Sequence, residues 1–146
     1  DKYAQFVRAA GKFSTQGDAQ SSDFVLRAST TNATATEMFL DGSAAKLVLA
    51  NDTTWAYMIL IVARRSDSDG ESAAWIFEGC IDRGVSAGTI DFVGAPSKRV
   101  LARDTAAWDV SLVLDYTNGC FKIMVSGSTS KTIKWVAAVR TCEVTG

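Results

Sequence analysis

The chain has 146 residues, which is enough for one domain with a sizeable core. It carries 15 Lys and Arg against 16 Asp and Glu, so its formal net charge of -1 offers no basic surface for nucleic acid or an anionic membrane. It contains no histidine, and this absence removes the commonest general base and metal ligand.

The first 16 residues differ from the rest of the chain. Apolar residues over 3–10 fall near helical spacing, but this stretch is short and ends at Gly11. We therefore expect a lead-in over 1–16, either an extended arm or a short helix, followed by a single β domain over 17–146. Because the chain starts at Asp1 rather than Met, we also expect it to be part of a longer or processed protein.

Short apolar or alternating segments, separated by turn residues, fill the remainder of the chain. We expect strands over 23–28, 37–40, 46–49, 55–65, 73–81, 89–93, 98–102, 108–116, 120–126 and 131–144. Turn signals recur about every 8–12 residues, which is typical of sandwiches and jelly rolls. The pattern predicts an all-β antiparallel sandwich or jelly-roll-like fold of about 8–10 short strands. The apolar run over 55–63 is far shorter than the roughly 20 residues of a membrane-spanning helix, so we expect no membrane insertion.

One hairpin can be predicted in detail from its turn residues. Asn118-Gly119 is the strongest signal for a two-residue type I′ turn, because both central positions of that turn need positive φ. This turn would pair Tyr116 with Phe121, Leu114 with Ile123, Leu112 with Val125, and Asp115 with Lys122. The apolar pairs would share one face, with the opposite charges on the other.

Two of the expected strands are apolar on both sides. In the strand over 55–65, Trp55, Tyr57, Ile59 and Ile61 alternate with Met58, Leu60 and Val62. The strand over 131–144 shows the same double pattern. One side would pack inside the domain with Trp75, Trp108 and Trp135, and the other side would pack against a partner subunit.

The sequence gives little support for a disulfide or for a metal site. Cys80, Cys120 and Cys142 are an odd number of widely spaced cysteines, so we expect three free thiols, consistent with assembly in a reducing cytoplasm. The loop with Asp67, Asp69, Gly70 and Glu71 has alternating carboxylates like a calcium loop but lacks a distal ligand. We read it as a polar hairpin loop and expect no metal and no cofactor.

We expect no catalytic residues. A glycosidase would need two facing carboxylates, and the candidates are Asp18, Asp23, Glu37, Glu78, Asp82, Asp104 and Asp109. The sequence shows no such pairing, and exposed acids are usually solvated. Ser, Thr and Cys nucleophiles would lack a histidine base. We expect the arginines on strands, Arg64, Arg65 and Arg140, to pair with Glu78, Asp82 or Glu143, either across strands or between subunits.

Several segments resemble a known module. They are 29–42, 47–56, 62–65, 77–83, 105–110 and 133–144. Together they resemble a β-rich module of structural proteins in tailed bacteriophages, found near the C-termini of tail fibre and tailspike proteins. The resemblance covers the chain from about Gly11 onward. It implies a virion protein, assembled in the host cytoplasm, and a homotrimer.

These observations lead to an expected function and two alternatives. We expect a non-enzymatic structural domain of a phage particle, the C-terminal trimerisation and receptor-binding part of a tail fibre or tailspike, whose receptor is a host glycan or protein. The receptor-binding residues are unknown. A carbohydrate-binding module attached to an enzyme would instead expose Trp or Tyr in a groove. A capsid decoration or assembly protein would lay the arm over 1–16 on a neighbouring subunit.

Overall fold

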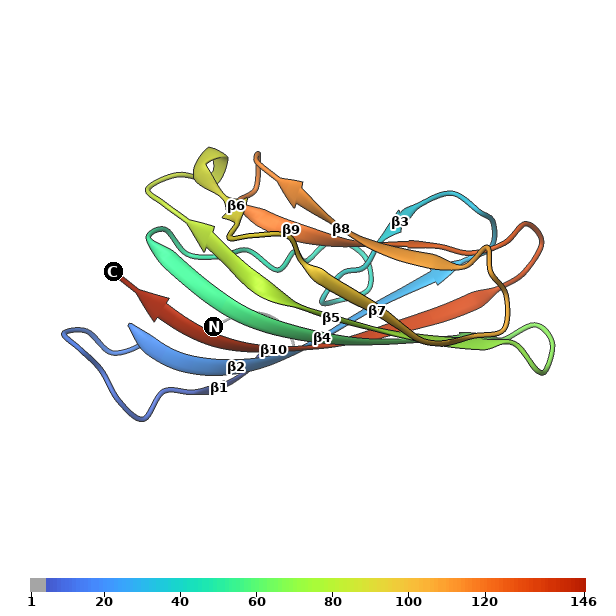
Figure 1. The fold of residues 1–146 in the computed structure, drawn as a ribbon, viewed down its shortest axis with the longest axis horizontal. Helices are drawn as coiled ribbons and strands as arrows, with labels where there is room; N and C mark the ends of the chain where they lie inside the picture. Colours follow the sequence, from blue (N-terminus) through green and yellow to red (C-terminus); the bar gives the residue numbers. More distant parts are fainter. Residues whose placement is uncertain (1–4) are drawn as a thin grey trace.

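The computed structural model describes residues 5–146, which form two antiparallel sheets packed face to face (Figure 1). The large sheet contains β1 (Gln5–Arg8), β2 (Ala19–Thr30), β10 (Ile133–Thr145), β4 (Thr53–Arg65) and β5 (Ser72–Arg83) in that spatial order, with β6 (Asp91–Phe92) and β7 (Ser97–Arg103) both paired to β5. The small sheet contains β3 (Thr36–Glu37), β9 (Cys120–Ser126) and β8 (Asp109–Asp115). A 3-10 turn, η1 (Ala87–Thr89), precedes β6. The expected all-β antiparallel sandwich is confirmed.

The core lies between the sheets and follows the alternation of the strands. Trp55, Ile59 and Ile61 of β4 are at most 1% exposed, and they point toward the small sheet. The expected core positions Trp75, Trp108 and Trp135 are fully buried. Their rings touch, since Trp135 stacks on Trp75 at 5.7 Å and lies 6.1 Å from Trp108 between ring centroids. The indole Nε1 of Trp135 also donates to Thr30 Oγ1 at 3.0 Å.

The segment between β3 and β4 differs from the two strands expected over 37–40 and 46–49. Only Thr36–Glu37 forms a strand, followed by isolated bridges of Phe39 with Arg27 and of Val48 with Cys120. The chain here passes from one sheet to the other: Phe39 exchanges backbone hydrogen bonds with β2, whereas Met38 N donates to Ile123 O of β9. A segment that alternates between two sheets cannot continue a ladder with either, although its apolar residues are still buried.

The β8–β9 hairpin is confirmed, but its predicted register is wrong. The loop spans 116–119, and Asp115 lies opposite Cys120 rather than Lys122. Leu114 therefore pairs with Phe121, and Val113 with Lys122. A shift of two residues keeps every side chain on its predicted face, since the side-chain period of a strand is two.

The Asp115 side chain explains the wider loop. Its carboxylate accepts hydrogen bonds from the backbone N of Thr117 and Asn118, at 3.1 and 3.0 Å, and from Asn118 Nδ2 at 2.8 Å. Among the four loop residues, only Gly119 has positive φ, at 66°. Side-chain capping therefore stabilises a four-residue loop over the two-residue turn expected from Asn-Gly.

Gly119→Ala is expected to destabilise the domain more than the same change at Gly70. Both glycines have positive φ, but a Cβ at Gly119 would clash with the Arg83 guanidinium, whereas Gly70 has open space around it. Arg83 Nη1 donates to Leu49 O and holds the neighbouring segment in place. We expect Gly70→Ala to lower the free energy of unfolding by about 1 kcal/mol, and Gly119→Ala by about 1–2 kcal/mol more. Urea unfolding measures both, and equal losses would contradict the clash.

The N-terminal segment joins the large sheet. Residues 5–8 form strand β1, which pairs with residues 21–24 of β2 in the same chain. Of the two forms left open for the lead-in, these residues take the extended one, and residues 1–4 lie outside the described part. Within the described part, there is no helix with the length and apolarity needed to cross a membrane.

Candidate protein interface

The outer face of the large sheet, on the side away from the small sheet, is uncovered and apolar. We define this outer face by the residues of β2, β10, β4 and β5 that alternate with the core positions. Met58, Leu60 and Val62 of β4 are 48%, 50% and 51% exposed, although Ile59 and Ile61 between them are fully buried. The other large apolar side chains exposed on this face are Val25, Val136 and Val144. The expected two-sided strands are therefore present, and their second side faces solvent in the single chain.

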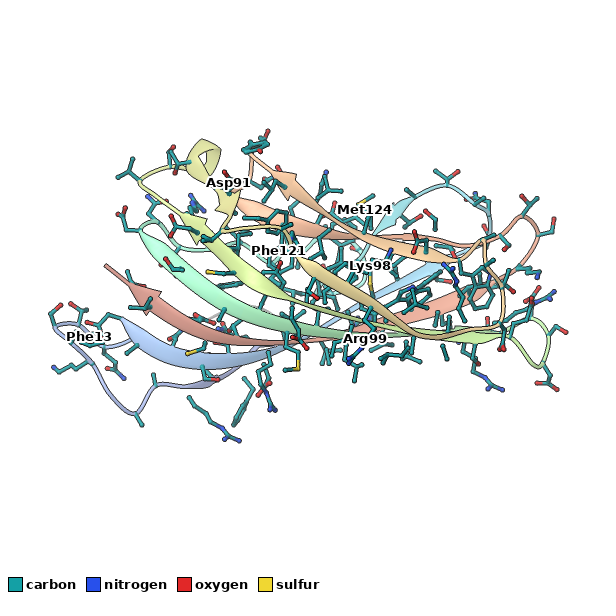
Figure 2. All side chains as sticks on the ribbon, in the orientation of Figure 1. Phe13, Asp91, Lys98, Arg99, Phe121 and Met124 are labelled. Carbon is teal, nitrogen blue, oxygen red and sulfur yellow. The ribbon has the colours of Figure 1, made fainter. Side chains whose placement is uncertain are left out.

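The alternation extends to the edge strand β7 (Figure 2). Lys98 lies between the sheets, where its Nζ contacts Asp109 Oδ1 at 2.6 Å, and Arg99 lies on the opposite side of the strand. Arg99 is opposite Ile76 of β5, which belongs to the outer face. The apolar centre of the outer face is thus bordered by charged side chains.

The outer face also carries several hollows, and one of them lies beside Cys142. The hollow has a volume of about 370 Å³ and is bordered by Met58, Arg140 and Cys142. It forms where small side chains, those of Ser21 and Ala56, sit between larger neighbours. This hollow beside exposed apolar side chains makes the surface uneven, as protein interfaces often are.

The carboxylates considered as catalytic candidates fall at separate places and have local partners. Asp18 caps the loop over 13–15, Asp23 pairs with Arg140, Glu37 with Lys46, Asp82 with the Thr54 hydroxyl, Asp104 with the Ser72 amide and Asp109 with Lys98. Glu78 lies on the outer face, opposite Met58. The backbone amides of Ser14 and Thr15 hold the pKa of Asp18 below its usual value. The geometry gives the six acids with these partners structural roles.

The loop suggested as a calcium site binds cationic side chains of the chain itself. Arg65 contacts Asp67 at 2.8 Å and Glu71 at 2.7 Å, and Glu71 also accepts from Lys131 at 2.5 Å and from Thr105 at 2.8 Å. Among residues 5–146, no three His, Cys, Asp or Glu side chains converge to hold a metal ion. Glu71 instead connects the loops at this end of the sandwich.

Stability is expected to fall in acid as Glu71 becomes protonated. Hydrogen bonds from Lys131, Arg65 and Thr105 lower the pKa of Glu71 from 4.5 to about 2. Because the folded pKa is the lower one, this contribution is present above about pH 4.5 and is lost as the pH falls toward 2. We expect Glu71→Gln to flatten the fall in melting temperature between pH 4.5 and 2. The control is Asp52→Asn, in an exposed turn away from this cluster and from the outer face, and it should leave the slope unchanged. An unchanged slope in Glu71→Gln would contradict the prediction.

Within the single chain, the arginines pair with acids other than the expected Glu78, Asp82 and Glu143, and pairing with these acids between subunits stays a prediction. Arg65 pairs with Asp67 and Glu71, Arg140 pairs with Asp23 at 2.9 Å, and Arg64 approaches Asp69 only at 3.9 Å. Arg140 and Glu143 cannot meet because they point to opposite sides of β10. Glu143 lies on the inner side, where it accepts from Gln20 Nε2 at 2.6 Å.

The three thiols are free, as expected. Cys80 and Cys142 both lie on the outer face, opposite Ala56 on either side of β4. Two strand spacings of roughly 4.8 Å separate them, which is beyond the reach of a disulfide. Burial raises the pKa of the Cys120 thiol to about 12. Cys142 is exposed, so it reports on whether the outer face is covered.

The tryptophans provide no exposed surface for stacking on sugars. All four tryptophans, Trp55, Trp75, Trp108 and Trp135, are at most 1% exposed. Tyr116 is 56% exposed at the tip of the β8–β9 hairpin. The exposed tryptophan that would favour a carbohydrate-binding module is therefore not present.

Comparison with known proteins gives only weak structural similarity. No family model matches the chain, and no curated protein matches its sequence. Among solved structures, the chain is similar to the tailspike protein of Acinetobacter phage vB_ApiP_P1, with a TM-score of 0.29 and 11% identity. The match covers 95% of this chain and 24% of the tailspike chain, so this chain spans about a quarter of that protein.

Proposed function

We propose that the chain is a non-enzymatic structural domain of a tailed-bacteriophage particle, from the C-terminal part of a tail fibre or tailspike. Its role is to assemble with copies of itself and to present the assembled loops to the host surface. The observation that carries the assembly role is the uncovered apolar outer face of the large sheet. The phage context rests on the sequence resemblance of segments such as 29–42 and 133–144.

Burial of the outer face would release substantial free energy. Leu60, Val62 and Met58 each leave about half of their surface in water, and Val25, Val136 and Val144 leave nearly as much. At roughly 25 cal/mol per Å² of apolar area, covering such side chains contributes on the order of 1 kcal/mol each. Contiguous exposed apolar patches on soluble proteins are usually interaction sites. This supports assembly of the chain through the outer face.

Assembly also supports a role in host attachment. Several copies on one rigid oligomer bind a repeated surface receptor with higher avidity than one copy does, without any new contact. The receptor would be a host glycan or a surface protein. The resemblance implies three copies, and this number stays a prediction.

Sedimentation velocity and cell binding test the proposal. We expect the purified chain to sediment as an oligomer at micromolar concentration. We also expect the fluorescently labelled oligomer to bind intact cells of its bacterial host more tightly than an assembly-deficient variant does. A monodisperse monomer at all concentrations would contradict the assembly role, whereas equal binding by oligomer and monomer would contradict avidity.

A further inference from the structure

The loop between β1 and β2 presents an exposed aromatic ring. Phe13 is 80% exposed, more than any other large apolar side chain in the described part of the chain. It lies where this loop projects beyond the ends of the strands (Figure 2). Lys12 before it is also exposed, and within residues 5–146 its side chain makes no ion pair or hydrogen bond. The loop therefore offers a ring and a cation side by side.

Asp18 holds the backbone of this loop in place. Its carboxylate accepts hydrogen bonds from the backbone N of Phe13 at 2.9 Å and from those of Ser14 and Thr15, both at 2.7 Å. The Asp18 carbonyl accepts from Thr145 N at 2.9 Å, which connects the loop to the end of β10. A side chain on an ordered backbone loses less conformational freedom when it binds. The loop thus presents Phe13 in an ordered conformation, which suits a binding anchor.

The hollow beside Cys142 has room for an apolar side chain and carries an unpaired carboxylate. Its volume is about 370 Å³, and Glu78 and Arg140 both line it. Arg140 is neutralised by Asp23 at 2.9 Å, whereas Glu78 makes no ion pair or side-chain hydrogen bond within the described part. The net charge at the rim is therefore negative, and we call this site the acidic hollow.

Two further hollows on the outer face differ from the acidic hollow in charge. The one at the centre of the face has about 220 Å³ and contains only the neutral pair of Asp23 with Arg140. The other has about 320 Å³ and is lined by Arg27, Lys134 and Asp41, so its cations outnumber its carboxylates. A ring that arrives with a lysine beside it is matched best by the acidic hollow.

We propose that Phe13 of one copy of the chain inserts into the acidic hollow of the next copy, with Lys12 beside Glu78 at the rim. This inference rests on the proposed assembly through the outer face and identifies one contact within it. The chain supplies both halves of the contact, and neither half is filled within a single copy. A second copy is therefore the occupant that the structure itself provides.

The loop and the acidic hollow are different surfaces, so the contact is head-to-tail. Such contacts close into rings when the rotation between copies allows it. Ser21 lines the acidic hollow and is the third residue of β2, directly after the loop, so the loop and the hollow lie at the same end of the sandwich. Rotation about an axis parallel to the strands keeps the two at similar heights. The contact therefore suits a ring of three copies, the number that the resemblance implies.

Removal of the ring tests its role in the contact. We expect Phe13→Ala to self-associate at least tenfold more weakly than the wild type in sedimentation velocity, because aromatic side chains that fill pockets dominate the affinity of interfaces. The matched control is Tyr116→Ala, which removes an aromatic side chain that is 56% exposed at the tip of the β8–β9 hairpin. It should associate as the wild type does. Equal association of Phe13→Ala and the wild type would overturn the proposal.

Cross-linking identifies the two surfaces that meet. Lys12→Cys keeps the ring and removes only a rim charge, which contributes little to affinity at an exposed site. Its thiol would lie near Cys142 of the next copy, since Cys142 lines the acidic hollow. We expect a short bismaleimide to give covalent dimers and trimers on a denaturing gel, beyond those of the wild type, and a further Cys142→Ser change to remove them. Tyr116→Cys is the control and should give no additional products.

The outcomes separate the inference from the proposed function. If the wild type is oligomeric but Lys12→Cys gives no products that depend on Cys142, the insertion is wrong while assembly through the outer face stands. If the wild type is a monomer at all concentrations, both are wrong. Phe13 and Lys12 are exposed, so we expect their variants to fold, and circular dichroism with thermal unfolding checks this. If Phe13→Ala folds and associates weakly while Lys12→Cys cross-links through Cys142, the insertion is supported.

Discussion

Trp135→Ala is expected to remove most of the stability of the domain, about 3–5 kcal/mol of the free energy of unfolding. The Trp135 ring is fully buried, stacks on Trp75 at 5.7 Å and lies against Trp108 at 6.1 Å. Its removal would leave a large cavity between the sheets and would deprive Thr30 of the indole donor at 3.0 Å. Urea unfolding followed by circular dichroism measures the loss.

A matched substitution on the surface controls for this prediction. Val113 in β8 is 42% exposed, so Val113→Ala should change the free energy of unfolding by less than about 0.5 kcal/mol. If Trp135→Ala cost no more than Val113→Ala, the tryptophan cluster would not be the centre of the core.

Leu60→Lys is expected to weaken association strongly while leaving the fold intact. Leu60 is 50% exposed at the centre of the outer face, so a lysine is tolerated in the single chain. In the oligomer, the same lysine would place a charge in the apolar centre of the interface, which costs far more than it does in water. We expect association weaker by at least tenfold, or about 1.4 kcal/mol or more, in sedimentation velocity over a range of concentrations.

Val113→Lys is the control for Leu60→Lys. Val113 has similar exposure but belongs to the small sheet, so a lysine there should leave the oligomer unchanged. Equal loss of association in both variants would indicate a general effect of added charge. Unchanged association in Leu60→Lys would place the interface elsewhere.

Side-chain alternation made much of the fold predictable. Both sets of alternating residues in β4 are apolar. As expected, Ile59 and Ile61 lie in the core, and Leu60 and Val62 lie on the outer face. Strand period depends only on local geometry, so it can be read from one sequence. The same reasoning placed Trp135 in the core.

Features that depend on contacts distant in sequence could not be predicted. The Asn118-Gly119 turn is wider than expected because Asp115 caps the loop. The preference of Asn-Gly for a two-residue turn does not take account of such a hydrogen bond from a neighbouring side chain. The crossing segment at Phe39 hydrogen-bonds to β2, while its neighbour Met38 bonds to β9, so its apolar pattern resembles a strand without forming one.

The charged neighbours on the outer face were also hidden in the sequence. Arg64 and Lys134 are 70 positions apart and become neighbours only because β10 inserts between β2 and β4. Sequence spacing within one strand cannot show which strand lies beside it. The apolar character of the outer face was visible from the sequence, but the neighbours of its charged residues needed the sheet order.

Alkylation of Cys142 tests most directly whether the outer face is covered in the assembled protein. Cys142 is exposed on this face in the single chain, next to Ala56 and the hollow. We predict that its rate of reaction with iodoacetamide falls as the protein concentration rises through the range of association, and that Leu60→Lys abolishes this dependence. A rate that is the same at all concentrations, in a chain that sedimentation shows to be oligomeric, would contradict burial of the outer face.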